Sequence, residues 1–151
     1  MQYDSVRRKR VSLPSQGDYV IVQGILARYI GKSEIVDIPQ GITRIGGGAF
    51  ASCGTLVSVT IPEGVTRIDK EAFVRCYELR RVIIPSSVTS IGDDAFKLCT
   101  NLRSVKVPIS VTKIGRQAFD SNSRFRATLY GMKGSYAEEY AREEHLHFVA
   151  E

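Results

Sequence analysis

The chain has 151 residues, of which 43% are hydrophobic and 25% are charged, and its net charge is +5 at neutral pH. These values fit one globular domain of ordinary composition. No apolar run approaches the roughly 18 residues that a membrane-spanning helix needs, and residues 1–10 lack the apolar core of a signal peptide. The sequence therefore excludes a transmembrane helix. Either the protein stays inside the cell or an export signal lies outside this sequence.

Residues 1–17 are predicted to form a poorly ordered basic arm. Four positive charges follow one another from Arg7 to Arg10, and no aromatic residue interleaves with them. That pattern does not favour nucleic acid, which usually requires stacking side chains beside the cations. A solvated terminus is the plain interpretation, and contact with a polyanion or an acidic membrane surface is the alternative.

Residues 18–37 are predicted to form a β-hairpin that caps a repeat array. Two β-prone runs, Tyr19–Val22 and Ile25–Ile30, flank Gln23-Gly24, a two-residue turn with glycine second. The array begins directly after this segment, and the first coil of such an array exposes an apolar end that needs a cover.

Residues 38–129 contain one pattern written four times, with a period of 23 residues and no insertion. The copies start at Ile38, Ile61, Ile84 and Val107, and each carries a proline next and an Ala-Phe pair further on. A fixed period in the twenties predicts a solenoid of stacked coils. The predicted fold class is an α/β solenoid of the leucine-rich repeat type. It is a right-handed coil with a parallel β-ladder on its concave face, short helical turns on its convex face, and a cap at each end.

Two columns of side chains are predicted to fill the interior. The phenylalanines of the four copies form one of them (Phe50, Phe73, Phe96 and Phe119). The other column contains the three cysteines, with an asparagine in the last copy (Cys53, Cys76, Cys99 and Asn122). A spacing of 23 residues does not match zinc-ligand pairs, so the cysteines are interpreted as buried, reduced thiols that bond weakly to neighbouring backbone groups.

The period fails after the fourth copy. Phe125 fits an inward position, but Thr128 does not, whereas Ala127 and Leu129 alternate correctly with Phe125. The interpretation is that the last strand has lost one residue. Residues 130–151 are predicted to form the C-terminal cap, with Ser135 and Glu138 as the capping box of a helix and a short strand after it.

No constellation for catalysis is recognisable. The only histidines are His145 and His147, so a catalytic triad has no base in the body of the fold. The stretch from Gly46 to Ala51 matches a dinucleotide-binding fingerprint, but the equivalent positions of the other copies do not. The prediction is a protein that is not an enzyme and has no cofactor and no metal.

The repeat resembles a known family. The string Ile-Pro-x-x-Val-Thr-x-Ile-Gly-x-x-Ala-Phe-x-x-Cys-x-x-Leu is similar to the BspA-like leucine-rich repeat, over about residues 18–149. The asparagine of the general leucine-rich consensus is absent, and its place is taken by Gly41, Gly64, Ser87 and Ser110. The resemblance implies a secreted or surface protein of bacteria, similar to adhesins that bind host matrix proteins or other cells.

A partner site is predicted on the concave face and its basic edge. Its residues are Ser58, Thr60, Arg80, Arg81, Ile83, Arg103, Ser104, Lys106 and Arg126. A positive patch of this kind suits an acidic protein or an anionic glycan. Scattered charge for solubility is the alternative, and a second basic column elsewhere supports it (Arg44, Arg67 and Lys113).

The predicted function is a non-enzymatic interaction module that binds a protein or glycan. The alternative is a structural spacer, or part of a larger repeat protein, with no ligand of its own. A monomer is the default expectation for the oligomeric state.

Overall fold

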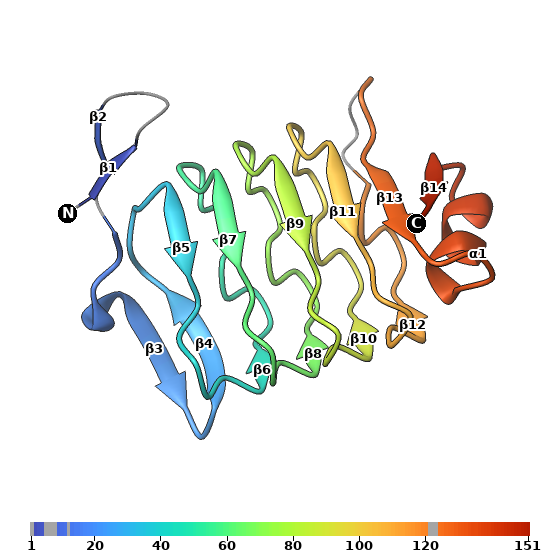
Figure 1. Cartoon of the computed structure of the whole chain (residues 1–151). Helices are drawn as coiled ribbons and strands as arrows, with labels where there is room; N and C mark the ends of the chain where they lie inside the picture. Colours follow the sequence, from blue (N-terminus) through green and yellow to red (C-terminus); the bar gives the residue numbers. More distant parts are fainter. Residues whose placement is uncertain (1, 5–8, 12, 121–123) are drawn as a thin grey trace.

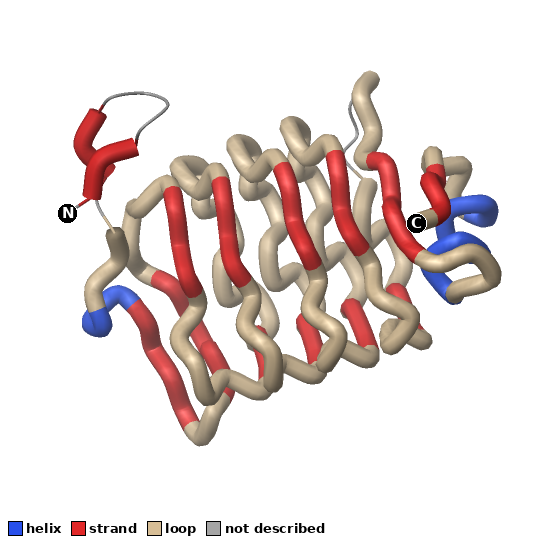
Figure 2. Tube along the Cα trace, viewed as in Figure 1, coloured by secondary structure: helices blue, strands red, loops and turns tan. Residues whose placement is uncertain are grey.

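The computed structural model describes residues 2–4, 9–11, 13–120 and 124–151 (Figure 1). Arg7 and Arg8 of the predicted basic arm, and Asn122 of the predicted thiol column, lie outside the described residues. The chain winds into a β-solenoid of about five turns whose strands build two separate sheets. Figure 2 shows the longer strands of one sheet side by side, with the short strands of the other sheet on the opposite side of each coil.

The first sheet, named the ladder sheet, is parallel throughout. It has six strands, namely β5 (Ile35–Asp37), β7 (Ser58–Thr60), β9 (Arg81–Ile83), β11 (Ser104–Lys106), β13 (Thr128–Gly131) and β14 (Phe148–Ala150).

The second sheet also has six strands and is parallel except for its first pair. Its strands are β3 (Tyr19–Val22), β4 (Ile25–Tyr29), β6 (Arg44–Ile45), β8 (Arg67–Ile68), β10 (Ser90–Ile91) and β12 (Lys113–Ile114). The remaining elements are an antiparallel pair, a 3₁₀ turn and one helix, namely β1 (Gln2–Asp4), β2 (Lys9–Val11), Gln16–Asp18 and α1 (Tyr136–Glu143).

The phenylalanine column is confirmed and forms the centre of the core. The rings of Phe50, Phe73, Phe96 and Phe119 are at most 2% exposed. Neighbouring rings are nearly parallel, and their centroids are 4.9, 4.9 and 5.4 Å apart. This spacing follows from the strand-to-strand distance of about 4.8 Å, because each ring projects from the same position of successive coils.

The predicted helical turns on the far side of each coil are hydrogen-bonded turns instead. In the second repeat the N–H groups of Glu71, Phe73 and Arg75 donate to carbonyl oxygens of the next coil, at 3.0, 2.7 and 2.8 Å. An α-helix would keep these donors within its own segment. Glu71 and Arg75 also have left-handed φ angles of 59° and 60°, which a helix cannot contain. The prediction that the ladder sheet is concave depended on bulky helices on the far side of each coil. The outer surface of this sheet is therefore named the ladder face, without reference to curvature.

The thiol column is confirmed for Cys76 and Cys99, which are buried, whereas Cys53 at the start of the column is only half-buried. The Cys76 thiol donates to the carbonyl oxygen of Phe50, and the Cys99 thiol donates to that of Phe73, both at 3.1 Å. Contact with the Cys99 thiol, together with burial, raises the pKa of Cys76. These thiols are therefore structural side chains that link one coil to the next.

The last strand differs from its prediction. Val105 pairs with Leu129, a step of 24 residues (105 to 129), whereas Val82 pairs with Val105, a step of 23 (82 to 105). The strand has gained one residue and has not lost one. Leu129 is buried as predicted, but Phe125 is 59% exposed, because the added residue moves it out of the inward position.

Two elements lie at the ends of the array (Figure 1). At the N-terminal end, β3 and β4 form the hairpin, with left-handed φ angles at both Gln23 and Gly24, and the Tyr29 ring lies 5.1 Å from that of Phe50. At the C-terminal end, Tyr140 of α1 meets Phe119 edge-on at 6.2 Å. Both tyrosine rings extend the phenylalanine column by one ring.

The cap of helix α1 differs slightly from the predicted capping box. The Ser135 hydroxyl accepts the N–H of Glu138 at 3.4 Å, as expected. The Glu138 carboxylate, however, accepts the N–H of Gly134 at 2.6 Å, one residue before the N-cap.

Candidate functional site

The ladder face brings six of the predicted site residues together. Arg81 lies between Ser58 and Ser104 in the register of β7, β9 and β11. Ile83 lies beside Lys106 in the same sheet. Thr60 occupies the position equivalent to Ile83 in the preceding coil and also points outward. Each of these strands buries its central valine and turns its two flanking residues outward. Alternation along the strands therefore positions these side chains on one surface.

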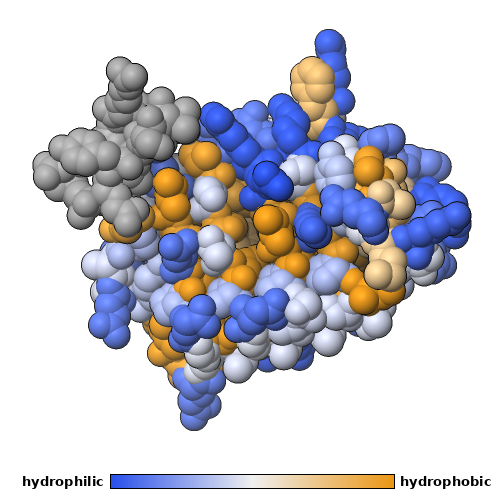
Figure 3. Space-filling model, in the orientation of Figure 1, coloured by the Kyte–Doolittle hydropathy of each residue, from blue (hydrophilic) through white to orange (hydrophobic). Residues whose placement is uncertain are grey.

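Two shallow hollows lie side by side on this face. The first has a volume of about 410 Å³ and lies over β9, β11 and β13, with Arg81, Ile83, Ser104, Lys106, Tyr130 and Glu151 as its lining. The second has a volume of about 470 Å³, lies over β7 and β9, and is lined by Ser58, Thr60, Glu63, Arg81, Ile83 and Pro85 among others. Arg81 and Ile83 line both hollows and therefore form the ridge between them. Figure 3 shows hydrophobic and hydrophilic side chains mixed over the ladder strands.

The two hollows differ in charge. The first contains two cations, Arg81 and Lys106, against the Glu151 carboxylate, which lies 3.3 Å from the Lys106 Nζ. The second contains one cation and the Glu63 carboxylate. Hydrogen bonds from the Ser86 hydroxyl and backbone N–H lower the pKa of Glu63, so this carboxylate stays ionised. An anionic group is therefore favoured only in the first hollow.

The predicted basic edge is only partly assembled. The N–H of Arg103 donates to the Arg80 carbonyl oxygen at 2.9 Å, so these two residues are neighbours in adjacent coils. Arg126 does not continue their column, because the added residue gives that register position to Ala127. The Arg126 guanidinium instead donates to the Glu144 carbonyl oxygen at 3.2 Å. The Arg103 guanidinium lies over the Phe125 ring, 5.2 Å from its centroid.

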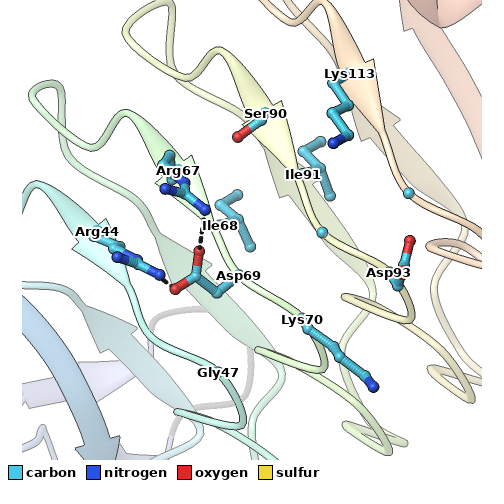
Figure 4. A pocket seen from close by; sticks show the side chains of 12 residues that line it. Arg44, Gly47, Arg67, Ile68, Asp69, Lys70, Ser90, Ile91, Asp93 and Lys113 are labelled. Carbon is cyan, nitrogen blue, oxygen red and sulfur yellow. Dashed lines mark hydrogen bonds and ion pairs between the residues drawn. The ribbon is translucent and has the colours of Figure 1, made fainter.

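The second basic column lies on the second sheet, where a hollow of about 460 Å³ opens beside it (Figure 4). Arg44, Arg67, Ser90 and Lys113 follow one another in register. The Asp69 carboxylate reaches between the first two, forming an ion pair with Arg44 and a second one with Arg67 at 3.7 Å. The single negative charge of Asp69 is therefore shared between two of these cations, and the hollow keeps a net positive charge.

Sequence reasoning missed three residues of the ladder face. Tyr130 lies beside Lys106, and the inward position of Leu129 already placed it on the outer side of β13. Glu63 had no signal, because its role depends on the turn of the next coil. Glu151 had none either, because it reaches Lys106 only through the pairing of β14 with β13.

The described part of the chain holds neither a cluster of metal ligands nor a membrane-spanning helix. Within it, no three histidine, cysteine, aspartate or glutamate side chains gather as metal ligands would. The longest helix among these same residues, α1, has eight residues and is too short to cross a bilayer.

The repeat matches a family profile over most of its length. The profile is described as the BspA type leucine rich repeat region, and six copies of it match residues 28–135. The chain belongs to the BspA-type leucine-rich repeat family. Families of this kind are typically non-catalytic repeat domains, in line with the absence of a catalytic constellation from the sequence. A search of curated proteins gave no match.

Solved structures of bacterial leucine-rich repeat proteins are similar to this BspA-type chain. One is the leucine-rich repeat protein of Treponema pallidum, at 24% identity and a TM-score of 0.58, with 85% of this chain and 71% of that chain covered. Another is a leucine-rich cell surface protein from Faecalibacterium prausnitzii, at 27% identity and a TM-score of 0.62, covering 78% and 37%. The pneumococcal vaccine antigen PcpA shares the fold at 17% identity and a TM-score of 0.59, covering 83% and 38%. The chain thus spans well under half of the latter two proteins.

Proposed function

We propose that this BspA-type repeat is a non-enzymatic interaction module that binds a protein or an anionic glycan through its ladder face. The observation that carries the proposal is the first hollow, where Arg81, Lys106 and Tyr130 from three neighbouring strands surround one surface. An acidic group of the partner lies between the two cations, and an apolar or ring-shaped part packs against Ile83 and Tyr130.

The composition of this surface supports the proposal. Arginine and tyrosine are enriched where proteins bind partners, because they combine a large contact area with a directional polar group. Ile83 is 52% exposed at the ridge between the two hollows, so an apolar contact is available at the centre of the face. The strands hold these side chains at fixed spacing, which reduces the entropy lost on binding.

A secreted or cell-surface location is part of the proposal. It is supported by the 27% identity to the F. prausnitzii protein, which is itself a cell surface protein. The rival function is a structural spacer within a longer repeat protein, which is supported by the small share of that protein that this chain spans.

The test is a capture experiment with the purified chain. The chain is passed over matrix proteins and over neutral, sulfated and sialylated glycans, at low and at high salt. The double variant Arg81→Glu/Lys106→Glu is expected to lose at least about tenfold in affinity for any ligand captured, because the anion of the partner then faces two carboxylates. Glu151→Gln is expected to strengthen the same capture, because it removes the carboxylate that pairs with Lys106.

The matched control is Lys113→Glu/Arg116→Glu, which changes the net charge equally but lies on the other side of the coils. It is expected to bind as the wild type does. If it weakens capture as much as the ladder-face variant, net charge and not the ladder face governs binding. If no ligand is captured at low salt, the spacer function is favoured.

A further inference from the structure

The exposed hydrophobic side chains of this protein are concentrated at its N-terminal end. Ten large hydrophobic residues are exposed in the described part of the chain, and five of them lie between residues 13 and 30. These five are named the N-terminal apolar edge, and they are Leu13 at 37%, Val20 at 43%, Ile21 at 42%, Val22 at 56% and Ile30 at 56% exposure. Leu13 and Ile21 line one hollow together, and exposed apolar side chains gathered at one end of a molecule usually mark an interaction surface.

Strand β3 adds unpaired backbone groups to this surface. It is the outermost strand of the second sheet, and its outer side pairs with no other strand among the described residues, β1 and β2 included. Natural proteins usually protect such an edge with lysine, proline or a covering loop. Strand β3 contains neither lysine nor proline. Its one protective feature is a register irregularity between Val20 and Ile21, since a bulge also disturbs edge pairing. A hollow of about 350 Å³, lined mainly by Leu13, Pro14, Tyr19, Ile21 and Pro39, opens beside the strand.

The opposite end of the second sheet is closed. Helix α1 packs against β12, the last strand of that sheet. A second copy of the chain therefore cannot add its β3 to β12 in a head-to-tail stack without displacing the helix. Within the second sheet, the edge that remains open for β3 is therefore the β3 of another copy.

We propose that the N-terminal apolar edge binds a second copy of this chain, with the two β3 strands paired antiparallel about a two-fold axis. The residues from Tyr19 to Val22 are uncharged, so no like charges face each other along the strand. Asp18, which precedes the strand, faces the Gln23-Gly24 turn of the other copy. The pairing consumes the open β3 edge of each copy, so assembly through β3 stops at a dimer.

The dimer adds a property to the molecule but does not rest on the proposed function of the ladder face. Each copy contributes its own ladder sheet, and β3 belongs to the other sheet, so both ladder faces remain accessible. Two linked sites raise the apparent affinity for a multivalent partner such as a polymeric glycan. Failure of glycan or protein capture would leave the dimer unaffected, and failure of the dimer would leave the ladder face unaffected.

Sedimentation equilibrium of the 151-residue chain over a range of concentrations tests the proposal. The wild type is expected to approach twice its chain mass of 16.8 kDa as the concentration rises. The variant Val20→Lys/Val22→Lys is expected to stay at the mass of one chain, because two lysines from each copy would meet across the axis. Circular dichroism checks that the variant is folded.

The matched control is Ile109→Lys/Met132→Lys, which also replaces two exposed hydrophobic residues, 58% and 51% exposed, but far from β3. It is expected to dimerise as the wild type does. Hydrogen exchange on the wild type gives a second measurement, in which the β3 amides gain protection as the concentration rises. A wild type that stays monomeric throughout, or a control that loses the dimer equally, overturns the proposal. So does a dimer that forms only after residues 1–12 are deleted, because the arm then covers the edge in the whole chain.

Discussion

Two serines at the same repeat position differ in their hydrogen bonding. The Ser87 hydroxyl donates to the Val65 carbonyl oxygen at 2.7 Å and accepts the N–H of Gly64 at 3.0 Å. It thereby links two coils where the general leucine-rich consensus has an asparagine. Among the described residues, the buried Ser110 hydroxyl has no hydrogen-bond partner. The reason is that the equivalent donor, the N–H of Ser87, already bonds to the Glu63 carboxylate at 3.1 Å.

Alanine substitutions should separate these two serines. Ser87→Ala is expected to lower the free energy of unfolding by about 1–2 kcal/mol, because it leaves two backbone groups without their partner. Ser110→Ala is expected to be neutral or slightly stabilising, since it removes a buried hydroxyl that bonds to nothing within the described chain. Urea unfolding of both variants measures the difference. Equal losses would contradict the assigned hydrogen bonds.

At the scale of single elements, the terminal helix depends on a buried tyrosine. Tyr140 is 5% exposed in α1, and its burial raises its pKa from 10.0 to about 12. Below pH 10 the folded and unfolded chains both keep this proton, so the contribution of this group to stability does not change with pH. Between about pH 10 and 12 only the unfolded chain loses it, so the stability due to this group falls as the pH rises.

Tyr140→Phe should therefore reduce the alkaline loss of stability. The free energy of unfolding of the wild type is expected to fall by up to about 2–3 kcal/mol through this group between those pH values. The variant lacks the phenol and should not show this part of the fall. Thermal unfolding measured at neutral pH and in steps toward pH 12 checks the difference. Tyr77→Phe, at a tyrosine that is 44% exposed, is the control and should follow the wild type. Identical alkaline profiles for all three proteins would disprove the effect.

The elements show where sequence reasoning was sufficient. The Gln23-Gly24 turn predicted the hairpin, because a two-residue loop requires left-handed φ angles at both positions. The turns on the far side of each coil were wrongly predicted as helical, because Ala-Phe pairs fit a helix as well as a turn. The left-handed φ angles at Glu71 and Arg75 have no sequence signal, since neither residue is a glycine. Phe125 was misplaced because hydrophobic alternation cannot distinguish one residue gained from one residue lost.

At the scale of the whole molecule, the candidate site was predictable only as far as the period extends. The register placed Arg81, Ile83, Ser104 and Lys106 on one face, because four copies at an identical spacing fix which side chains point outward. The placement of Arg126 in the column of Arg80 and Arg103 was wrong, because Arg126 lies beyond the last regular copy. Glu151 reaches this face only through the packing of the chain end, which no periodic pattern describes.

The stacked rings also predict how the whole array unfolds. Each coil bonds mainly to its neighbours, so the stability of a solenoid is a sum of coil and interface terms. Phe96 contacts the ring before it and the ring after it at 4.9 and 5.4 Å, so Phe96→Ala weakens two interfaces at once. The expected loss is about 3–5 kcal/mol, a large share of a domain's usual stability.

An array of about five coils is short enough that such a loss should be felt throughout. Hydrogen exchange in Phe96→Ala is therefore expected to accelerate in β7 and β11 alike, although only β11 directly follows the altered coil. Phe125→Ala removes a ring that is 59% exposed and should change stability by less than about 0.5 kcal/mol. If exchange accelerated only from β11 onward, the coils before Phe96 would form an independent folding unit, and the interior would consist of two cooperative parts.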